Sequence, residues 1–180
     1  KDPGAVPRLL VNNGAGIFYR ASCGIEVPTK DPRGVAYGDI DNDGDIDFYI
    51  ACKDGQNFLL QNDYDEGNNY IDIVCIGPRG DYGGFGSKVT VYEPGHLGDR
   101  TKILGYQEST SNYGYLSQNQ TALHFGLREF TACDIRIVLT DGSTFNYTGV
   151  PANQTFEMDG EAEEHLTINY ISGDNQSGEP

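Results

Sequence analysis

The sequence contains no tryptophan, no apolar run near 18 residues and no window with sustained helical periodicity. The missing apolar run excludes a membrane-spanning helix, and the missing periodicity argues against a helical fold. Glycine is abundant instead, with 24 residues, and short apolar runs alternate with Gly, Asn and Asp. This pattern is typical of strands joined by tight turns. We therefore predict an all-β chain.

Basic residues are scarce: the chain has 12 against 27 acidic residues, which gives a formal net charge of -15. Nucleic-acid binding requires a basic face, and anionic lipid also attracts basic segments. We therefore expect neither nucleic acid nor membrane as a partner. An acidic excess suits cation binding. The chain begins at Lys1 without a signal peptide, so we interpret it as a mature, processed chain or a fragment.

The four cysteines lack C-x-x-C spacing, which disfavours a zinc site. They are Cys23, Cys52, Cys75 and Cys133. Two disulfides are one interpretation, with Cys23 paired to Cys52 and Cys75 paired to Cys133; buried free thiols are the other. Asn-x-Ser/Thr sequons at Asn119, Asn146, Asn153 and Asn175 are candidate glycosylation sites. Sequons and disulfides together indicate a secreted, extracellular protein.

No catalytic set is apparent in the sequence. The three histidines, His96, His124 and His165, lie far apart, and no serine lies in a nucleophile elbow. Carboxylates are numerous, but nothing marks a particular pair for glycoside chemistry. We therefore expect that the protein is not an enzyme.

The chain divides into two β-rich parts and a tail. Residues 1–66 contain an N-terminal arm and three short predicted strands, at 34–38, 46–52 and 57–61. Residues 67–171 contain longer predicted strands at 70–76, 87–93, 101–108, 132–140 and 144–147, with a further candidate at 165–171. Residues 172–180 are expected to be a disordered tail.

The most specific motif is the aspartate-rich segment from Asp39 to Asp47. Carboxylates recur at its first, third, fifth and ninth positions, and glycine stands at the sixth. Calcium takes six to eight oxygen ligands on a bendable loop. The candidate ligands are Asp39, Asp41, Asp43, Asp45 and Asp47, with Asp45 offering its backbone carbonyl. Ile50 at the twelfth position rules out an EF-hand. The alternative is an acidic hairpin turn without a metal.

These residues resemble a known family. Gly34–Ile50 and the flanking Asn12–Phe18 look like an FG-GAP (VCBS) repeat. Motifs at 84–89, 115–119, 123–127 and 150–155 resemble the ASPIC/UnbV domain, which ends the cartilage acidic protein family. The resemblance implies an extracellular calcium-binding fold with no established catalytic residues. It predicts a calcium-loop β-meander, like one propeller blade, followed by an antiparallel β-sandwich.

A single propeller blade cannot bury both faces of its sheet. We therefore expect another protein surface to cover the exposed face. We expect a glycosylated, calcium-stabilised filament whose subunits associate head to tail, through β-strand addition by the arm at 1–20. The alternative is an adhesion or glycan-binding module of a larger propeller protein, with glycans or cell-surface receptors as partners. Arg79-Gly80-Asp81 is an adhesion-type tripeptide, or else an ordinary charged turn.

Overall fold

The structure, a computed structural model, describes residues 6–22, 24–63, 67–114 and 117–158. These residues form an all-β fold with one short 3-10 helix, η1 (Arg100–Lys102), and they include no helix long and apolar enough to cross a membrane. The predicted strand at 165–171 and the predicted tail lie outside the described residues. The strands are β1 (Leu9–Asn12), β2 (Phe18–Ala21), β3 (Pro32–Gly38), β4 (Asp47–Cys52), β5 (Phe58–Leu60), β6 (Asn69–Val74), β7 (Lys88–Tyr92), β8 (Ile103–Glu108), β9 (Leu123–Arg128), β10 (Ala132–Val138), β11 (Thr144–Pro151) and β12 (Thr155–Glu157).

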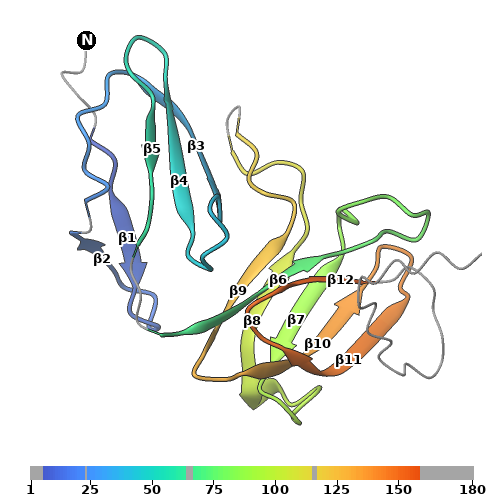
Figure 1. Cartoon of the computed structure of the whole chain (residues 1–180). Helices are drawn as coiled ribbons and strands as arrows, with labels where there is room; N and C mark the ends of the chain where they lie inside the picture. The colour runs from blue at the N-terminus through green and yellow to red at the C-terminus, as the bar shows by residue number, and fades with distance from the viewer. Residues whose placement is uncertain (1–5, 23, 64–66, 115–116, 159–180) are drawn as a thin grey trace, which may run out of the picture.

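Strands β6 to β12 form the predicted sandwich. One sheet has the order β11-β10-β7-β8 and the other has the order β12-β6-β9. Pairing is antiparallel except between β12 and β6, which run parallel, so the predicted antiparallel sandwich is confirmed, with one parallel pair at this edge. The parallel pair arises because the chain returns after β11 through a short turn and adds a three-residue strand to the opposite sheet (Figure 1).

The sandwich core follows the two-residue period of its strands. Val89 and Val91 of β7, and Ile135 and Ile137 of β10, are all fully buried. These side chains alternate with more exposed neighbours, as expected when one face of a sheet packs on the other sheet. Sixteen buried residues form one contiguous cluster, and all of them lie at or after Ile71.

The part of the chain before residue 64 forms two small sheets, which we call the N-terminal unit (residues 6–22 and 24–63). Strands β3, β4 and β5 form the predicted antiparallel meander. Strands β1 and β2 form a separate two-stranded hairpin. No sheet hydrogen bonding joins the hairpin to the meander, or either to the sandwich, among the described strands. In Figure 1 the N-terminal unit, blue to teal, lies to one side of the sandwich.

Two asparagines explain why the N-terminal arm folds back as a hairpin. The Asn12 side-chain oxygen accepts from the Gly14 and Gly16 amides at 2.9 and 3.2 Å. The Asn13 oxygen accepts from the Ala15 and Ile17 amides at 2.9 and 3.3 Å. Asparagine side chains of this kind satisfy turn amides that have no partner in a strand ladder. The N-terminal arm therefore contributes a strand that is already paired within the chain.

Burial differs sharply between the two parts of the chain. Among the described residues, 19 hydrophobic residues are buried, and of these only Ile50 belongs to the N-terminal unit. Of the 13 exposed large hydrophobic residues in the same part of the chain, nine belong to this unit: Val6, Leu10, Ile17, Phe18, Tyr19, Val35, Ile40, Tyr49 and Leu59. The sandwich thus has its own core, whereas much of the apolar surface of the N-terminal unit faces solvent.

Candidate metal centre

The aspartate-rich segment is the loop between β3 and β4, and side chains within the loop hold its shape. The Asp39 carboxylate accepts from the Asp43 amide at 3.2 Å and from the Gly44 amide at 3.0 Å. The Asp43 carboxylate accepts from the Asp45 amide at 2.9 Å. Asn42 and Gly44 have positive φ angles of 61° and 96°. These features curl the loop around its own carboxylates.

Three of the five predicted ligands converge in space. One carboxylate oxygen each from Asp39, Asp41 and Asp43 lies within 4.8 Å of the others. Three negative charges at this separation repel one another unless a cation lies between them. An all-oxygen donor set on a curled loop matches the ligand preference of calcium. These three side chains could therefore hold a metal ion.

The carboxylates of the other two predicted ligands are not part of this cluster, and for Asp45 the predicted donor is the backbone carbonyl. Asp47 is buried, and its carboxylate accepts from the Ile40 amide at 2.9 Å and from the Asn62 amide at 2.9 Å. It thereby fastens the base of the loop to the segment that follows β5. Asp45 is not part of the group of three carboxylates. The structure thus brings together the first three predicted ligands and gives Asp47 a structural role.

Residues from the sandwich hold the base of the loop in place. The Asn119 side-chain oxygen accepts from the Tyr37 amide at 3.0 Å, and the Gln120 amide donates to the Tyr37 carbonyl at 3.2 Å. The Gln120 side-chain oxygen accepts from the Asp39 amide at 2.9 Å. The first residue of the cluster is therefore fixed by a partner 81 residues away in the sequence.

The same contact continues into the sandwich through a polar network. The Gln120 side-chain nitrogen donates to Asp72 at 3.3 Å, and His124 Nδ1 lies 3.0 Å from the same carboxylate oxygen. The His124 ring stacks on Tyr70 with 5.6 Å between centroids. A Cβ atom on Gly44 would lie 2.3 Å from the Tyr70 ring, so the two residues are in direct contact. His124 therefore lies in a packed, hydrogen-bonded environment.

The aspartates of the loop affect the pKa of Tyr70. Burial raises the pKa of its phenol, and the nearby carboxylates of Asp39, Asp72 and Asp43 raise the pKa further. Negative charge disfavours the phenolate, which is the cause of the latter effect. No local pattern in the sequence indicated Tyr70, Gln120 or Asp72, because their contacts with the loop join distant segments.

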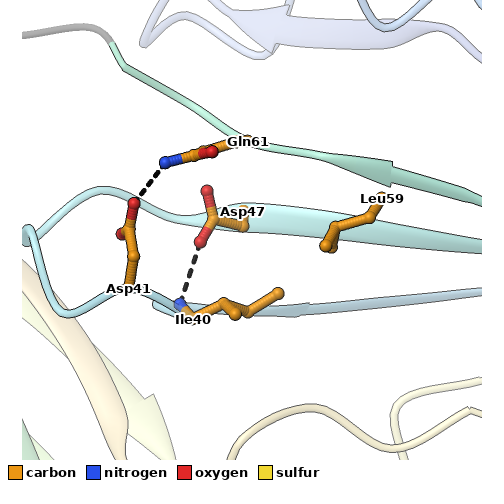
Figure 2. A pocket seen from close by; sticks show the side chains of 5 residues that line it. All are labelled: Ile40, Asp41, Asp47, Leu59 and Gln61. Carbon is orange, nitrogen blue, oxygen red and sulfur yellow. Dashed lines mark hydrogen bonds between the residues drawn. The ribbon is translucent and has the colours of Figure 1, made fainter.

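A small pocket opens beside the cluster, on the face of the meander that carries Leu59. It has a volume of about 70 Å³ and is lined by Ile40, Asp41, Asp47, Leu59 and Gln61. Figure 2 shows Asp41 and Gln61 at one end, where the Gln61 side-chain nitrogen donates to the Asp41 carboxylate, and Leu59 at the other. The pocket therefore has an acidic end and an apolar end.

The predicted disulfide between Cys75 and Cys133 is wrong in this structure. Cys52, Cys75 and Cys133 are free thiols, and Cys23 lies outside the described residues. Cys75 and Cys133 are buried in the sandwich core, where burial raises the pKa of each thiol to about 12. They pack there as small apolar side chains. The predicted partner of Cys23, Cys52, is also unpaired.

The candidate glycosylation sites differ in how accessible their asparagine side chains are to solvent. Asn119 is only 8% exposed and its carboxamide is bonded to Tyr37, so a glycan cannot be added there without disturbing the loop contact. Asn153 is exposed, but its carboxamide bonds to Asn69 and to the Tyr70 amide. Asn146 is exposed on β11; Arg136 Nε donates to its carboxamide oxygen at 3.0 Å, whereas at Asn153 the nitrogen that would carry a glycan is itself bonded to Asn69. Asn175 lies outside the described residues. The structure thus favours Asn146 among the candidates.

The Arg79-Gly80-Asp81 tripeptide forms an exposed tight turn closed by the Ile76–Tyr82 bridge. The Gly77 amide donates to the Asp81 carbonyl at 2.9 Å, and the Gly80 amide donates to the Gly77 carbonyl at 2.8 Å. The Asp81 carboxylate folds back against Gly77 rather than extending from the turn, since a Cβ on Gly77 would lie 2.3 Å from it. This geometry is that of a charged turn.

Comparison with known proteins identifies part of the chain. A search of curated proteins found no match. The family model described as ASPIC and UnbV matches residues 77–165. This segment begins after β6, yet β6 is the central strand of the β12-β6-β9 sheet, so the folded sandwich extends upstream of the matched segment. Residues 77–165 are therefore similar to the ASPIC and UnbV family, as the motifs in this part of the sequence predicted.

Proposed function

We propose that the protein is an extracellular, calcium-stabilised structural subunit that assembles head to tail into a filament through its N-terminal hairpin (residues 9–21). The observation that carries the proposal is the uneven burial of apolar side chains. Within the described ranges, the N-terminal unit contributes nine of the 13 exposed large hydrophobic residues and one of the 19 buried hydrophobic residues. Apolar surface concentrated in this way marks a contact surface.

The hairpin is the element best suited to make that contact. An isolated two-stranded hairpin is only marginally stable in water, and both of its outer edges lack a strand partner among the described strands. Unpaired edges are templates for another chain. Association with a second copy would therefore stabilise the hairpin while burying its apolar side chains, each worth about 1.5–3 kcal/mol when fully buried.

Calcium has a separate role in the proposal. The ion would neutralise part of the repulsion among Asp39, Asp41 and Asp43 and fix the β3–β4 loop against the sandwich. An ion that binds only the folded state raises stability by mass action. Chelation should therefore lower the melting temperature of the wild-type chain. Asp41→Asn should remove most of this response, whereas Asp54→Asn, in the exposed loop at the other end of β4, should preserve it.

Assembly can be tested by electron microscopy and sedimentation of the whole chain in calcium-containing buffer. We expect filaments for the wild type, and their loss on deletion of residues 1–20, with the sandwich still folded by circular dichroism. A truncated chain that still polymerises would show that the hairpin is not the assembling element. A wild-type chain that stays monomeric at high concentration would refute the proposal.

A second function is favoured by one feature of the meander. Propeller blades have four strands, and the β3-β4-β5 sheet has three. Neighbouring blades of a longer protein would cover the same exposed apolar face, and the chain would then serve as an adhesion or glycan-binding module. Sequencing the gene upstream of the Lys1 codon decides between the two: further repeats of the aspartate loop would favour the module.

A further inference from the structure

The N-terminal unit carries two oppositely charged segments. Residues 6–22 contain Arg8 and Arg20 and no acidic residue, so they carry a formal charge of +2 in a chain whose net charge is -15. Residues 39–47 contain five aspartates and no basic residue. Bound calcium would leave this loop with a net negative charge. Opposite charges of this kind steer two surfaces together and fix their orientation.

The basic segment carries an exposed apolar face. Leu10 pairs with Arg20, and Asn12 pairs with Phe18, across the hairpin. Residues directly opposite on neighbouring strands point to the same side, so these four side chains form what we call the hairpin face. Leu10 is 57% exposed and Phe18 is 61% exposed. Arg20 forms a surface ion pair with Glu26 at 3.2 Å, and such pairs contribute little to stability.

The acidic segment adjoins a second exposed apolar face. Tyr49 and Leu59 are directly opposite each other on β4 and β5, and they are 41% and 59% exposed. Ile40, also exposed, lines the same pocket as Leu59. We call Ile40, Tyr49 and Leu59 the meander face. Figure 2 shows Asp41 at the end of this pocket opposite Leu59, so the apolar patch has an acidic end.

We propose that the hairpin face of one copy docks on the meander face of a second copy, with Arg20 directed toward the end that carries Asp41. The proposal rests on the filament function and names its acceptor surface. Both faces are exposed in a single copy, so neither covers the other within one chain. Since the two faces differ, the contact is heterologous, and each subunit keeps one free donor and one free acceptor. Repetition of this contact produces a chain of subunits.

A pair of complementary variants tests this geometry. The donor variant carries Leu10→Ser and Phe18→Ser, and the acceptor variant carries Tyr49→Ser and Leu59→Ser. Each variant alone should remain monomeric in sedimentation velocity, with assembly weakened at least tenfold. Mixed one to one, they should form dimers and nothing larger, because each dimer joins one intact hairpin to one intact meander face. The matched control Ile103→Ser with Tyr106→Ser, exposed on β8 of the sandwich, should polymerise like the wild type.

Circular dichroism and melting temperature establish that each variant is folded, and the single Ile40→Ser change serves as a second acceptor variant should the double one unfold. Wild-type polymerisation by the folded acceptor variants would overturn this inference and leave the filament proposal standing. A mixture that stays monomeric would likewise overturn it, because the two faces would not be partners. A wild-type chain that does not assemble would refute the filament proposal and this inference together.

Discussion

Replacement of Gly44 by alanine tests whether the loop and the sandwich are joined as the structure indicates. The change has two separable costs. Gly44 has a φ of 96°, a conformation that L-residues avoid, and strain of this kind costs roughly 1–2 kcal/mol. The new Cβ would also lie 2.3 Å from the Tyr70 ring, and such overpacking typically costs about 1–3 kcal/mol. The free energy of unfolding should therefore fall by about 2–5 kcal/mol.

A double-mutant cycle with Tyr70→Ala isolates the contact. Removal of the ring eliminates the overlap and leaves the strain, so Gly44→Ala should cost only about 1–2 kcal/mol in that background. Gly142→Ala is the matched control: Gly142 has a φ of 92° and nothing within 4 Å of the added Cβ. It should also cost about 1–2 kcal/mol.

The assay is urea-induced unfolding in calcium-containing buffer, followed by tyrosine fluorescence and by circular dichroism. The reasoning is refuted if Gly44→Ala is no more destabilising than Gly142→Ala, or if Tyr70→Ala fails to reduce its cost. Either result would mean that the loop does not rest on Tyr70. The joint between the meander and the sandwich would then need another explanation.

Three further predictions follow from individual contacts. Gln120→Ala removes the hydrogen-bond acceptor of the Asp39 amide and should lower the free energy of unfolding by about 1–3 kcal/mol. It should also lower the calcium affinity measured by calorimetry. The control variant Gln118→Ala, at an exposed neighbouring position, should change neither quantity. Cys75 and Cys133 should resist alkylation at pH 8 until the chain unfolds, while Cys52 should react in the folded state. Between pH 9 and about pH 12, the two thiols lose their protons in the unfolded chain but keep them in the folded chain. The free energy of unfolding should therefore fall as the pH rises through that window. In protein from a secreting eukaryotic host, mass spectrometry should find glycan at Asn146 and none at Asn119, and glycan at Asn119 would contradict the packing of that residue against Tyr37.

The sequence predicted those features that depend on local pattern. Alternating apolar residues located β7 and β10 to within two residues, because the core-facing positions Val89, Val91, Ile135 and Ile137 set a period of two. The aspartate spacing likewise identified Asp39, Asp41 and Asp43, whose oxygens converge because alternate residues of a curled loop point inward.

Other features could not be predicted, because they depend on contacts between distant segments. The hairpin is a local exception: its loop contains the turn signal Asn13-Gly14 and is closed by the side chains of Asn12 and Asn13, but this segment was interpreted only as the edge of a repeat. The strand β12 has only three residues and gains its place by pairing with β6, 83 residues earlier at Thr155 and Asp72. The spacing of cysteines in the sequence does not determine which of them form disulfides. Cys75 and Cys133 are buried among apolar residues of the same core, but they form no disulfide with each other.

The position of the aspartate loop suggests why a filament subunit would need calcium there. The loop bonds both to the meander base, where the Ile40 amide donates to Asp47, and to the sandwich, where the Asp39 amide donates to Gln120. Under the docking proposal, the hairpin face and the meander face both belong to the N-terminal unit. The N-terminal units would therefore form the filament axis, and each sandwich would project from its side. Any rotation at the joint would then change the spacing of the sandwiches from one subunit to the next. A cation that stiffens the loop restricts that rotation, and its removal should disorder the lateral repeat before it dissociates the filament.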